Sequence, residues 1–262
     1  MNRIETTFNR LRAQGEKALI PYIMAGDPDL ETTEALVPAL EAVGADLIEL
    51  GVPFSDPIAD GPTIQEAAER SLKNRTSLRG VLRLVRRLRR KTQVPLILMT
   101  YYNLIFQYGV DAFSRDAVAA GVDGVIIPDL PPEEGSELVA ASRKTGLSTI
   151  FLLAPTSDMD RIRRVSAVTS GFLYYVSLTG ITGARLSAES EIREKVAEIR
   201  RHTPVPIGVG FGISTPEQAG RISRFADGVI VGSALVRVIA ETRGNPVKAA
   251  ERFVRQIRKA IS

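Results

Sequence analysis

Eight short apolar segments alternate with amphipathic segments along the whole of this 262-residue chain. The apolar segments are Leu19 to Ala25, Leu47 to Leu50, Pro95 to Thr100, Gly124 to Ile127, Thr149 to Leu153, Phe172 to Ser177, Pro206 to Val209 and Gly228 to Val231. Because nearly continuous apolar strands that alternate with helices indicate a parallel sheet covered by helices, the pattern predicts an α/β fold. Eight units of this size favour closure into a (β/α) TIM barrel over an open doubly wound sheet.

One domain is predicted over residues 1–262, because a chain of this length with 44% hydrophobic residues can bury a single sizeable core. The amino-terminal segment, MNRIETTFNRLRAQG, reads as a short extra helix. Further helices are expected at Leu30 to Val43, Thr63 to Asn74, Glu133 to Thr145, Ser187 to Arg201 and Thr215 to Ser223. Thr63, with Glu66 three residues later, has the form of a capping box, and Asp158 and Thr215 are predicted N-caps.

The composition excludes several classes of site. The chain has no cysteine, which rules out disulfides, thiolate nucleophiles and cysteine metal sites. Its one histidine, His202, lies where a helix is expected to end before Pro204, so neither a histidine metal site nor a catalytic triad is expected. The basic run from Leu82 to Lys91 has no interleaved aromatic residues, so we expect its arginines to form a solvated helix surface, not a nucleic-acid platform.

No window of the sequence approaches the length of a membrane span, and the amino terminus lacks the apolar core of a signal peptide. The net charge of +4 is a mild excess that does not require a nucleic-acid partner. We therefore expect a cytoplasmic protein without membrane or nucleic-acid partners.

The segment LIELGVPFSDPIADGP, from Leu47 to Pro62, places two acids in contrasting surroundings. Glu49 lies in an apolar strand, where an unpaired carboxylate is costly or stays protonated, and Asp60 follows a proline-containing loop. Since carboxyl groups in different environments can hold different protonation states, the pair indicates acid/base chemistry. By strand alternation Glu49 shares a face with Leu47, which we expect to be the barrel interior; a core ion pair with an arginine is the alternative.

Functional residues of such a barrel gather where each strand ends. The segments GVGFGIS, from Gly208 to Ser214, and VIVGSAL, from Val229 to Leu235, each pass from a strand through glycines into a helix. Because glycines and a helix amino end let backbone N–H groups approach an anion, the two segments predict a phosphate site, with tight packing as the alternative. The segment SLTGITGAR, from Ser177 to Arg185, has the composition of a mobile lid.

Together these residues resemble one family closely, the α subunit of tryptophan synthase. The similarity extends over essentially the whole chain and includes PYIMAGDPD, LIELGVPFSDPIADGPTIQ, MTYYNLIFQYG, PDLPPEE, TGITG, GFGIS and GSALV. It implies a carbon–carbon lyase of tryptophan biosynthesis that cleaves indole-3-glycerol phosphate, by a retro-aldol reaction, into indole and glyceraldehyde 3-phosphate. It also implies an α2β2 complex in which a pyridoxal-phosphate-dependent β subunit receives the indole. No metal or organic cofactor is expected in this chain.

The resemblance also implies roles for single residues. The residues that match the catalytic acids and the active-site tyrosine are Glu49, Asp60 and Tyr174. Those that match the phosphate contacts are Gly183, Gly212, Gly232 and Ser233, and Thr182 belongs to the lid. We expect an indole pocket lined by Tyr22, Leu98, Ile127, Ile150 and Phe211. Tyr22 stands where the family commonly has phenylalanine, which adds a hydroxyl to this pocket.

Loop residues at the catalytic rim are predicted to dock the β subunit. They are Phe54, Asp56, Ile58, Asn103 and Ile105. Exposed apolar residues at an active-site mouth suggest a docking surface, and covering the protein's own barrel is the alternative. Because Asp60 closes the first of these loops, a partner that presses on the loop would reposition a catalytic group.

Three other functions remain open from the sequence. The first is another phosphate-binding barrel enzyme that acts on an earlier indole or sugar phosphate intermediate. The second is a stand-alone indole-3-glycerol phosphate lyase that releases free indole, and the third is a non-catalytic subunit that binds glycerol phosphates and regulates a partner. The segment from Leu47 to Pro62 argues against the first, and the retention of both Glu49 and Asp60 argues against the third.

Overall fold

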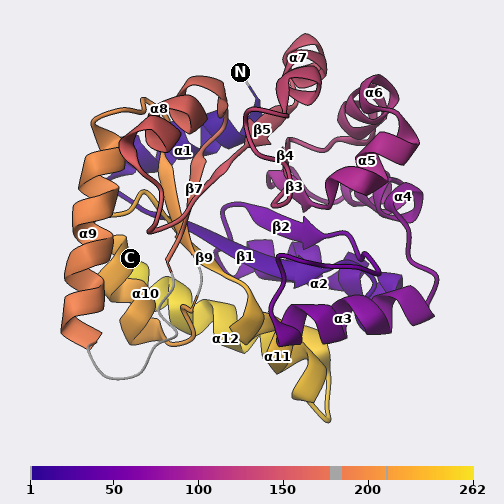
Figure 1. Ribbon diagram of the computed structural model, residues 1–262. Helices are drawn as coiled ribbons and strands as arrows, with labels where there is room; N and C mark the ends of the chain where they lie inside the picture. Colours follow the sequence, from indigo (N-terminus) through magenta and orange to yellow (C-terminus); the bar gives the residue numbers. More distant parts are fainter. Residues whose placement is uncertain (1, 178–184, 211) are drawn as a thin grey trace.

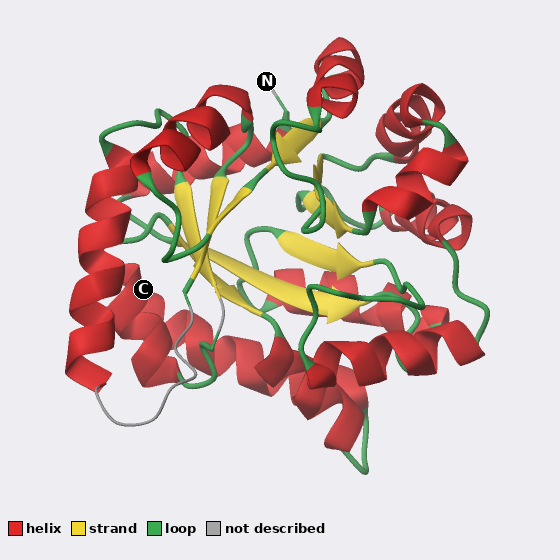
Figure 2. Cartoon of the chain, in the orientation of Figure 1, coloured by secondary structure: helices red, strands yellow, loops and turns green. Residues whose placement is uncertain are grey.

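The computed structural model describes residues 2–177, 185–210 and 212–262. Its strands form one parallel sheet that curls into a nearly closed ring, with helices around the outside (Figures 1 and 2). The strands are β1 (Ala18–Met24), β2 (Ile48–Gly51), β3 (Leu96–Met99), β4 (Gly124–Ile126), β5 (Ser148–Ile150), β6 (Leu152–Leu153), β7 (Leu173–Val176), β8 (Ile207–Gly210) and β9 (Gly228–Val231). Their order in the sheet is β5-β4-β3-β2-β1-β9-β8-β7-β6, which confirms the predicted parallel barrel.

The predicted fifth strand is divided in two, so the described chain has nine strands where the sequence predicted eight. β5 pairs with β4 and β6 pairs with β7, and Phe151 lies between them. The N–H of Phe151 donates to the Thr169 hydroxyl at 3.1 Å, whereas its carbonyl accepts the N–H of Tyr174 at 3.1 Å. Because the chain changes neighbours at Phe151, the two ends of the sheet meet within one continuous segment.

The helices alternate with the strands as predicted, and the predictions for their N-caps are partly confirmed. The helices are α1 (Arg3–Gln14), α2 (Leu30–Ala42), α3 (Pro62–Lys73), α4 (Leu78–Leu88), α5 (Tyr102–Tyr108), α6 (Val110–Ala120), α7 (Ser136–Thr145), α8 (Met159–Val168), α9 (Arg185–Arg200), α10 (Pro216–Ser223), α11 (Ser233–Glu241) and α12 (Pro246–Ile261). Asp158 and Thr215 cap α8 and α10, as predicted. The capping box at Thr63 is wrong, because Pro62 takes the first helical position and places Thr63 inside α3.

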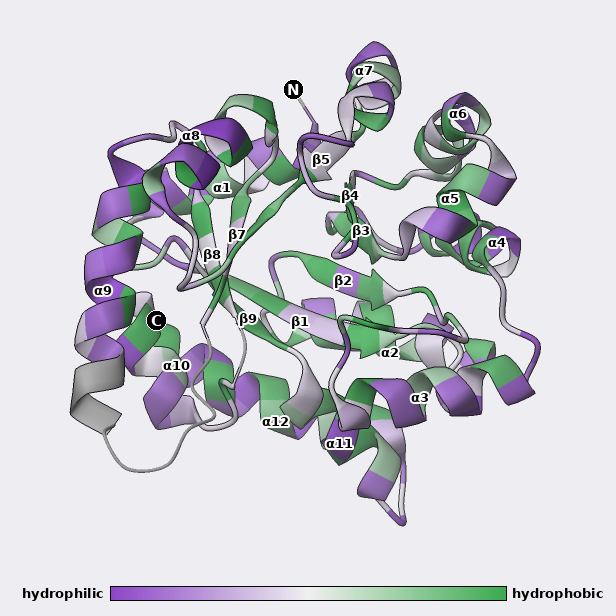
Figure 3. Cartoon of the chain, viewed as in Figure 1, coloured by the Kyte–Doolittle hydropathy of each residue, from purple (hydrophilic) through white to green (hydrophobic). Residues whose placement is uncertain are grey.

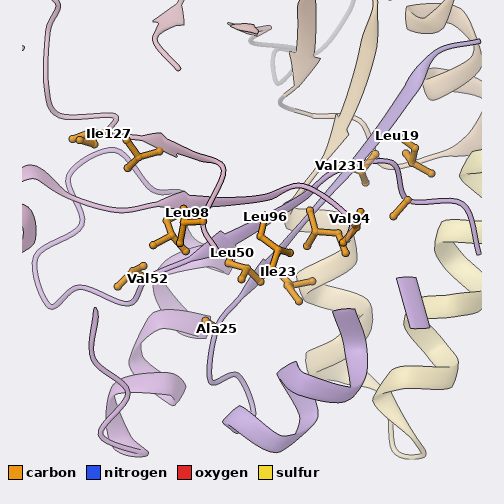
Figure 4. Packing of buried hydrophobic residues seen from close by; sticks show 14 of the residues in the cluster. Leu19, Ile23, Ala25, Leu50, Val52, Val94, Leu96, Leu98, Ile127 and Val231 are labelled. Atoms are coloured by element: carbon orange, nitrogen blue, oxygen red, sulfur yellow. The ribbon is translucent and has the colours of Figure 1, made fainter. Parts of the chain in front are cut away.

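Side-chain alternation divides the core into two layers. In β2, Ile48 and Leu50 belong to the large hydrophobic cluster between the sheet and the outer helices, and Figure 4 shows Leu50 within it. Glu49, between them, is paired in register with Tyr22 of β1 and Ile97 of β3, and Ile97 belongs to the cluster inside the ring. Glu49 therefore faces the interior, as the alternation predicted. The strands are predominantly hydrophobic, while the outer helices carry both hydrophobic and hydrophilic residues (Figure 3).

Three aspartates tie strands and helices together at the amino ends of the strands. The carboxylates of Asp46, Asp123 and Asp227 accept the backbone N–H groups of Leu19, Leu96 and Ile207 at 3.0, 2.9 and 2.9 Å, respectively. Each also pairs with an arginine from an outer helix or its end, and these arginines are Arg258, Arg89 and Arg200. Arg89 belongs to the basic run and is the member of it that turns inward, whereas Arg86 and Arg90 are exposed.

We expect Asp123→Ala to lower the free energy of unfolding by about 3 kcal/mol, because it leaves the largely buried Arg89 without its charge partner. Denaturant titration should show a lower midpoint with an unchanged slope. Glu34→Ala is the control, since Glu34 pairs with Arg87 and Lys91 at the surface. Equal losses in both variants would contradict a special role for Asp123.

Candidate active site

A cavity of about 290 Å³ lies on the inner side of the ring, at the carboxyl ends of the strands. Both acids singled out in the sequence line it, together with two tyrosines and the amino end of α11. Its lining residues are Tyr22, Glu49, Asp60, Gly61, Ile64, Met99, Tyr174, Gly212, Ile213, Ser214, Ile230, Gly232, Ser233, Ala234 and Arg237. The structure thus brings together residues that are far apart in the sequence.

Glu49 is fully buried in this cavity wall. Neither of its carboxylate oxygens has a hydrogen-bond partner among the described residues. Burial, which disfavours the charged form, raises the pKa of Glu49 to about 8. At neutral pH the group is therefore mostly a neutral acid that can give a proton and, once ionised, take one back.

Asp60 occupies a different environment. It is half-buried and stands directly before Gly61, the N-cap of α3. Burial raises its pKa, and a hydrogen bond with the Tyr101 side chain acts in the opposite direction. The two acids therefore differ in what acts on them: burial alone for Glu49, burial opposed by a hydrogen bond for Asp60.

Two buried tyrosines, Tyr22 and Tyr174, complete the polar wall. Each fits its hydroxyl against a strand-end glycine: a Cβ built on Gly51 would lie 2.0 Å from the Tyr22 oxygen, and one on Gly210 would lie 2.5 Å from the Tyr174 oxygen. Burial raises the pKa of both phenols well above their usual value, so both stay neutral hydroxyl groups. The glycines are needed here for close approach.

The opposite end of the cavity is built for an anion. Gly232 is the N-cap of α11 without a side-chain cap, and Ser233 is the first helical residue. The first N–H groups of a helix have no partner within the helix and favour negative charge. Gly212 also lines this end, with a φ of 77° that glycine adopts without strain. Gly183 and Thr182 lie outside the described residues.

Arg237 is a lining residue that the sequence reasoning missed. It follows Ser233 by one helical turn, so the two lie on the same face of α11. One of its guanidinium nitrogens donates to the Thr63 hydroxyl at 3.4 Å. The four-residue spacing from a predicted phosphate contact was the signal in the sequence that could have found it.

The predicted indole pocket needs correction. Leu98 and Ile127 do not line the cavity, because they pack outside the ring among Leu50 and Leu96 (Figure 4). Ile150 lies in the interior cluster without lining the cavity, and Phe211 lies outside the described residues. Tyr22 is in place. The apolar lining comes instead from Ile64, Met99, Ile213 and Ile230.

A second cavity, of about 540 Å³, adjoins the first and shares Asp60 and Met99 with it. Pro128, Leu152 and Val176 supply apolar lining there. Met99 was missed because the inward and outward alternation of side chains in β2 was not extended to the neighbouring strand β3. Glu49 pairs with Ile97, so Met99, two residues further along β3, faces inward and Leu98 outward.

The predicted docking residues differ in their exposure to solvent. Ile58 is 84% exposed, while Phe54 is half-buried and stacks on Tyr101 with ring centroids 5.1 Å apart. Asp56 and Asn103 are exposed. The prediction of Ile105 as a rim residue is wrong, since it is fully buried against the core. Its neighbour on α5, Phe106, is 66% exposed instead, because one residue along a helix turns the side chain to another face.

The described part of the chain holds no cluster of three or more acidic, histidine or cysteine side chains that could bind a metal ion. None of its helices combines the length and apolarity that crossing a membrane requires.

Comparison with known proteins gives one consistent match. A family model described as tryptophan synthase alpha chain matches residues 8–261. The tryptophan synthase alpha chain of Geotalea uraniireducens is 58% identical over 248 residues, which cover 95% of this chain and 93% of that protein. That of Geobacter sulfurreducens is 52% identical over 262 residues, covering 100% and 99%.

Solved structures give the same match. The crystal structure of tryptophan synthase subunit alpha from Legionella pneumophila has a TM-score of 0.94 and 43% identity, and covers 100% of this chain and 98% of that one. Tryptophan synthase from M. tuberculosis, in an aminoacrylate-bound form, has a TM-score of 0.90 and 36% identity, and covers 100% of both chains.

We expect Glu49 to make the folded protein less stable as the pH rises. Because the pKa of Glu49 is raised to about 8, its carboxyl group stays protonated in the folded state. In the unfolded chain the same group releases its proton at roughly pH 4.3, as ordinary glutamate does. The stabilisation is fully present below that pH and lost as the pH rises through about 8. The urea midpoints of wild type and Glu49→Gln should therefore diverge as the pH rises from about 4.3 to about 8, with Glu49→Gln the more stable protein at the upper end. A constant difference would contradict the raised pKa.

Proposed function

The chain belongs to the tryptophan synthase alpha chain family, and we propose that it cleaves indole-3-glycerol phosphate into indole and glyceraldehyde 3-phosphate. The reaction breaks the bond between indole C3 and the adjacent carbinol carbon. It requires a proton on C3, which turns the ring into an electron sink, and loss of the proton from the carbinol hydroxyl, which becomes the aldehyde. Both requirements are proton transfers, and the cavity wall holds a buried carboxyl group, that of Glu49, which can serve for both.

Glu49 is proposed to carry the proton. Its buried neutral carboxyl would protonate C3, and the resulting carboxylate would accept the hydroxyl proton as the carbon–carbon bond breaks, so the group ends as it began. The single observation that supports this most is that Glu49 is fully buried in a cavity wall and that no described residue is a hydrogen-bond partner of either carboxylate oxygen. Since a buried carboxyl without partners is costly, a substrate hydroxyl would supply the missing contact.

Asp60 is proposed to accept the hydrogen bond of the indole N–H. Protonation at C3 places positive charge on the ring nitrogen, and an ionised carboxylate in a partly buried site would stabilise that charge as it develops. Tyr174 would hold a neutral hydroxyl beside the reacting atoms. Met99, which lines both cavities, and Leu152 would contact the apolar ring.

The phosphate is proposed to bind at the amino end of α11, through the N–H groups of the Gly232–Ser233 turn and next to Gly212. The glycerol chain would then lie along Tyr22. The Cβ of Tyr22 is 3.6 Å from a Cβ built on Gly232, and its hydroxyl reaches Gly51 at the other end. Fixing both ends of the substrate would hold the scissile bond near Glu49.

The direct test is to supply indole-3-glycerol phosphate to the purified chain and to measure indole. Glu49→Gln should keep the fold and substrate binding and lower turnover by roughly 10²-fold to 10⁴-fold, the usual range for a lost general acid or base. Asp60→Asn should also be severely impaired. Glu34→Gln, at a surface ion pair, is the control.

Near-normal turnover of Glu49→Gln would reject the assignment of Glu49. Absence of indole from the wild type, alone and with a β subunit, would favour a regulatory subunit without activity. High turnover of the isolated chain that a β subunit does not change would favour a stand-alone lyase.

The phosphate site makes a separate prediction. Gly232→Val places a branched side chain on the N-cap that faces the cavity, so glycerol 3-phosphate and indole-3-glycerol phosphate should both bind more weakly. Indole propanol, which has no phosphate, should bind almost as before. Calorimetric titration with the three ligands distinguishes the outcomes, and an equal loss for all three would indicate misfolding or a different phosphate site.

A pyridoxal-phosphate-dependent β subunit is the proposed partner, to which indole would pass in an α2β2 complex. The exposed side chains of Ile58 and Phe106 support a docking surface at the rim of the cavity. Asp60 follows Ile58 by two residues, so contact with the loop could adjust a catalytic group.

Ile58→Asp together with Phe106→Asp should therefore weaken co-elution with the β subunit and reduce its stimulation of indole release. Each change leaves the buried core untouched, because both side chains are exposed. Val118→Asp is the matched control, since Val118 is an exposed apolar residue of α6 outside the predicted rim. Unchanged co-elution of the double variant would place the interface elsewhere.

A further inference from the structure

Tyr101 contacts both ends of the loop that carries Asp60. Tyr101 is the N-cap of α5, two residues after the end of β3, and is only 4% exposed. Its ring stacks on Phe54 at 5.1 Å with an interplanar angle of 29°. Its hydroxyl accepts the backbone N–H of Ala59 at 3.1 Å. One rigid side chain therefore holds residues 54 and 59, and Asp60 is the next residue of the chain.

The same hydroxyl acts on the Asp60 carboxylate. Burial raises the pKa of Asp60, and a hydrogen bond with the Tyr101 side chain counteracts that rise. Burial also raises the pKa of Tyr101, so the phenol keeps its proton and can donate it to a carboxylate while its oxygen accepts from Ala59. The Asp60 main-chain carbonyl is held separately by the Gln65 amide at 2.8 Å.

Other ionisable groups also face Asp60. Tyr22, Glu49 and Arg237 line the same cavity. Asp158 and Arg161 of the α8 segment line the adjoining cavity, which Asp60 shares. Tyr101 differs from these five groups because its side chain also holds the loop. It therefore links the loop to the carboxylate.

We propose that Tyr101 is a positioning residue for Asp60, which holds the loop from Phe54 to Ala59 by its ring and hydroxyl and orients the Asp60 carboxylate by a donated hydrogen bond. The proposal rests on the proposed function for its effect on catalysis. Tyr101 acts through Asp60 and the loop, and the reacting atoms are left to Glu49 and Asp60. A hydrogen bond to an ionised group is stronger than one between neutral groups, so the phenol favours the charged form that the ring nitrogen needs.

Tyr101→Phe tests this, because it removes the hydroxyl and keeps a ring that can stack on Phe54. We expect kcat to fall roughly tenfold with little change in KM, since the developing ring charge loses part of its stabilisation. The acid limb of the pH–rate profile should move to higher pH. In protein labelled with ¹³C at aspartate carboxyl groups, Asp60 should titrate at higher pH than in wild type.

Tyr108→Phe is the matched control. It also removes a bond between a tyrosine hydroxyl and an aspartate, from Tyr108 to Asp116 at 2.6 Å, at the other end of α5. Its kcat, pH profile and Asp60 titration should equal those of the wild type.

An unchanged Asp60 titration in folded Tyr101→Phe would overturn the proposal, as would a loss of kcat with no shift of the acid limb, which indicates only a structural role. Thermal melting shows whether Tyr101→Phe is folded. If it is not, the second variant is Tyr101→His, which keeps a ring and a hydrogen-bond donor. Asp60 in Tyr101→His must then titrate at the wild-type pH, or the proposal fails. The titration needs no substrate. A wild-type chain that releases no indole would therefore reject the proposed function without deciding the role of Tyr101.

Discussion

The register between β1, β2 and β3 places Tyr22, Glu49 and Ile97 side by side on the inner face of the sheet. The rest of the site depends on this. Because side chains alternate strictly along a strand, a shift of one residue would turn Glu49 toward the outer helices and bring Leu50 inside. The outer core of packed aliphatic side chains resists such a shift, since every one of them would lose its contacts. The position of the carboxyl is thus set by apolar packing on the opposite face.

The two ends of the barrel treat charge differently. At the amino ends of the strands, the buried Asp123 and the half-buried Asp46 are paired with arginines and with backbone N–H groups, so their charge is compensated. At the carboxyl ends, Glu49 has no hydrogen-bond partner among the described residues, and burial keeps it and the nearby tyrosines in their neutral forms. A carboxyl kept neutral at physiological pH is suited to proton transfer and unfavourable for stability. The same burial of Glu49 therefore lowers the stability of the fold and makes the cavity suitable for acid/base chemistry.

Much of the fold followed from the sequence, because apolar runs of strand length alternate with amphipathic ones, and each observed strand overlaps a predicted run. The break at Phe151 could not be predicted, since it depends on a hydrogen bond with Thr169. Within the site, Glu49 was placed correctly by alternation inside one strand, whereas Leu98 was misplaced because its orientation requires the register between two strands. Ile105 was misplaced because α5 has only seven residues, too few to fix the phase of a helix from hydrophobicity.

Separation along the strand axis has a consequence for engineering. Asp123 and Asp227 directly precede β4 and β9, while the cavity is lined from the carboxyl ends of the strands of the same sheet. Groups separated by more than about 7–10 Å without shared partners contribute additively to the free energy of unfolding. Substitutions at the amino end that stabilise the barrel should therefore offset the cost of new substrate-contacting residues at the other end. Stabilising substitutions at the amino ends of the strands can thus precede changes of the cavity at the carboxyl ends.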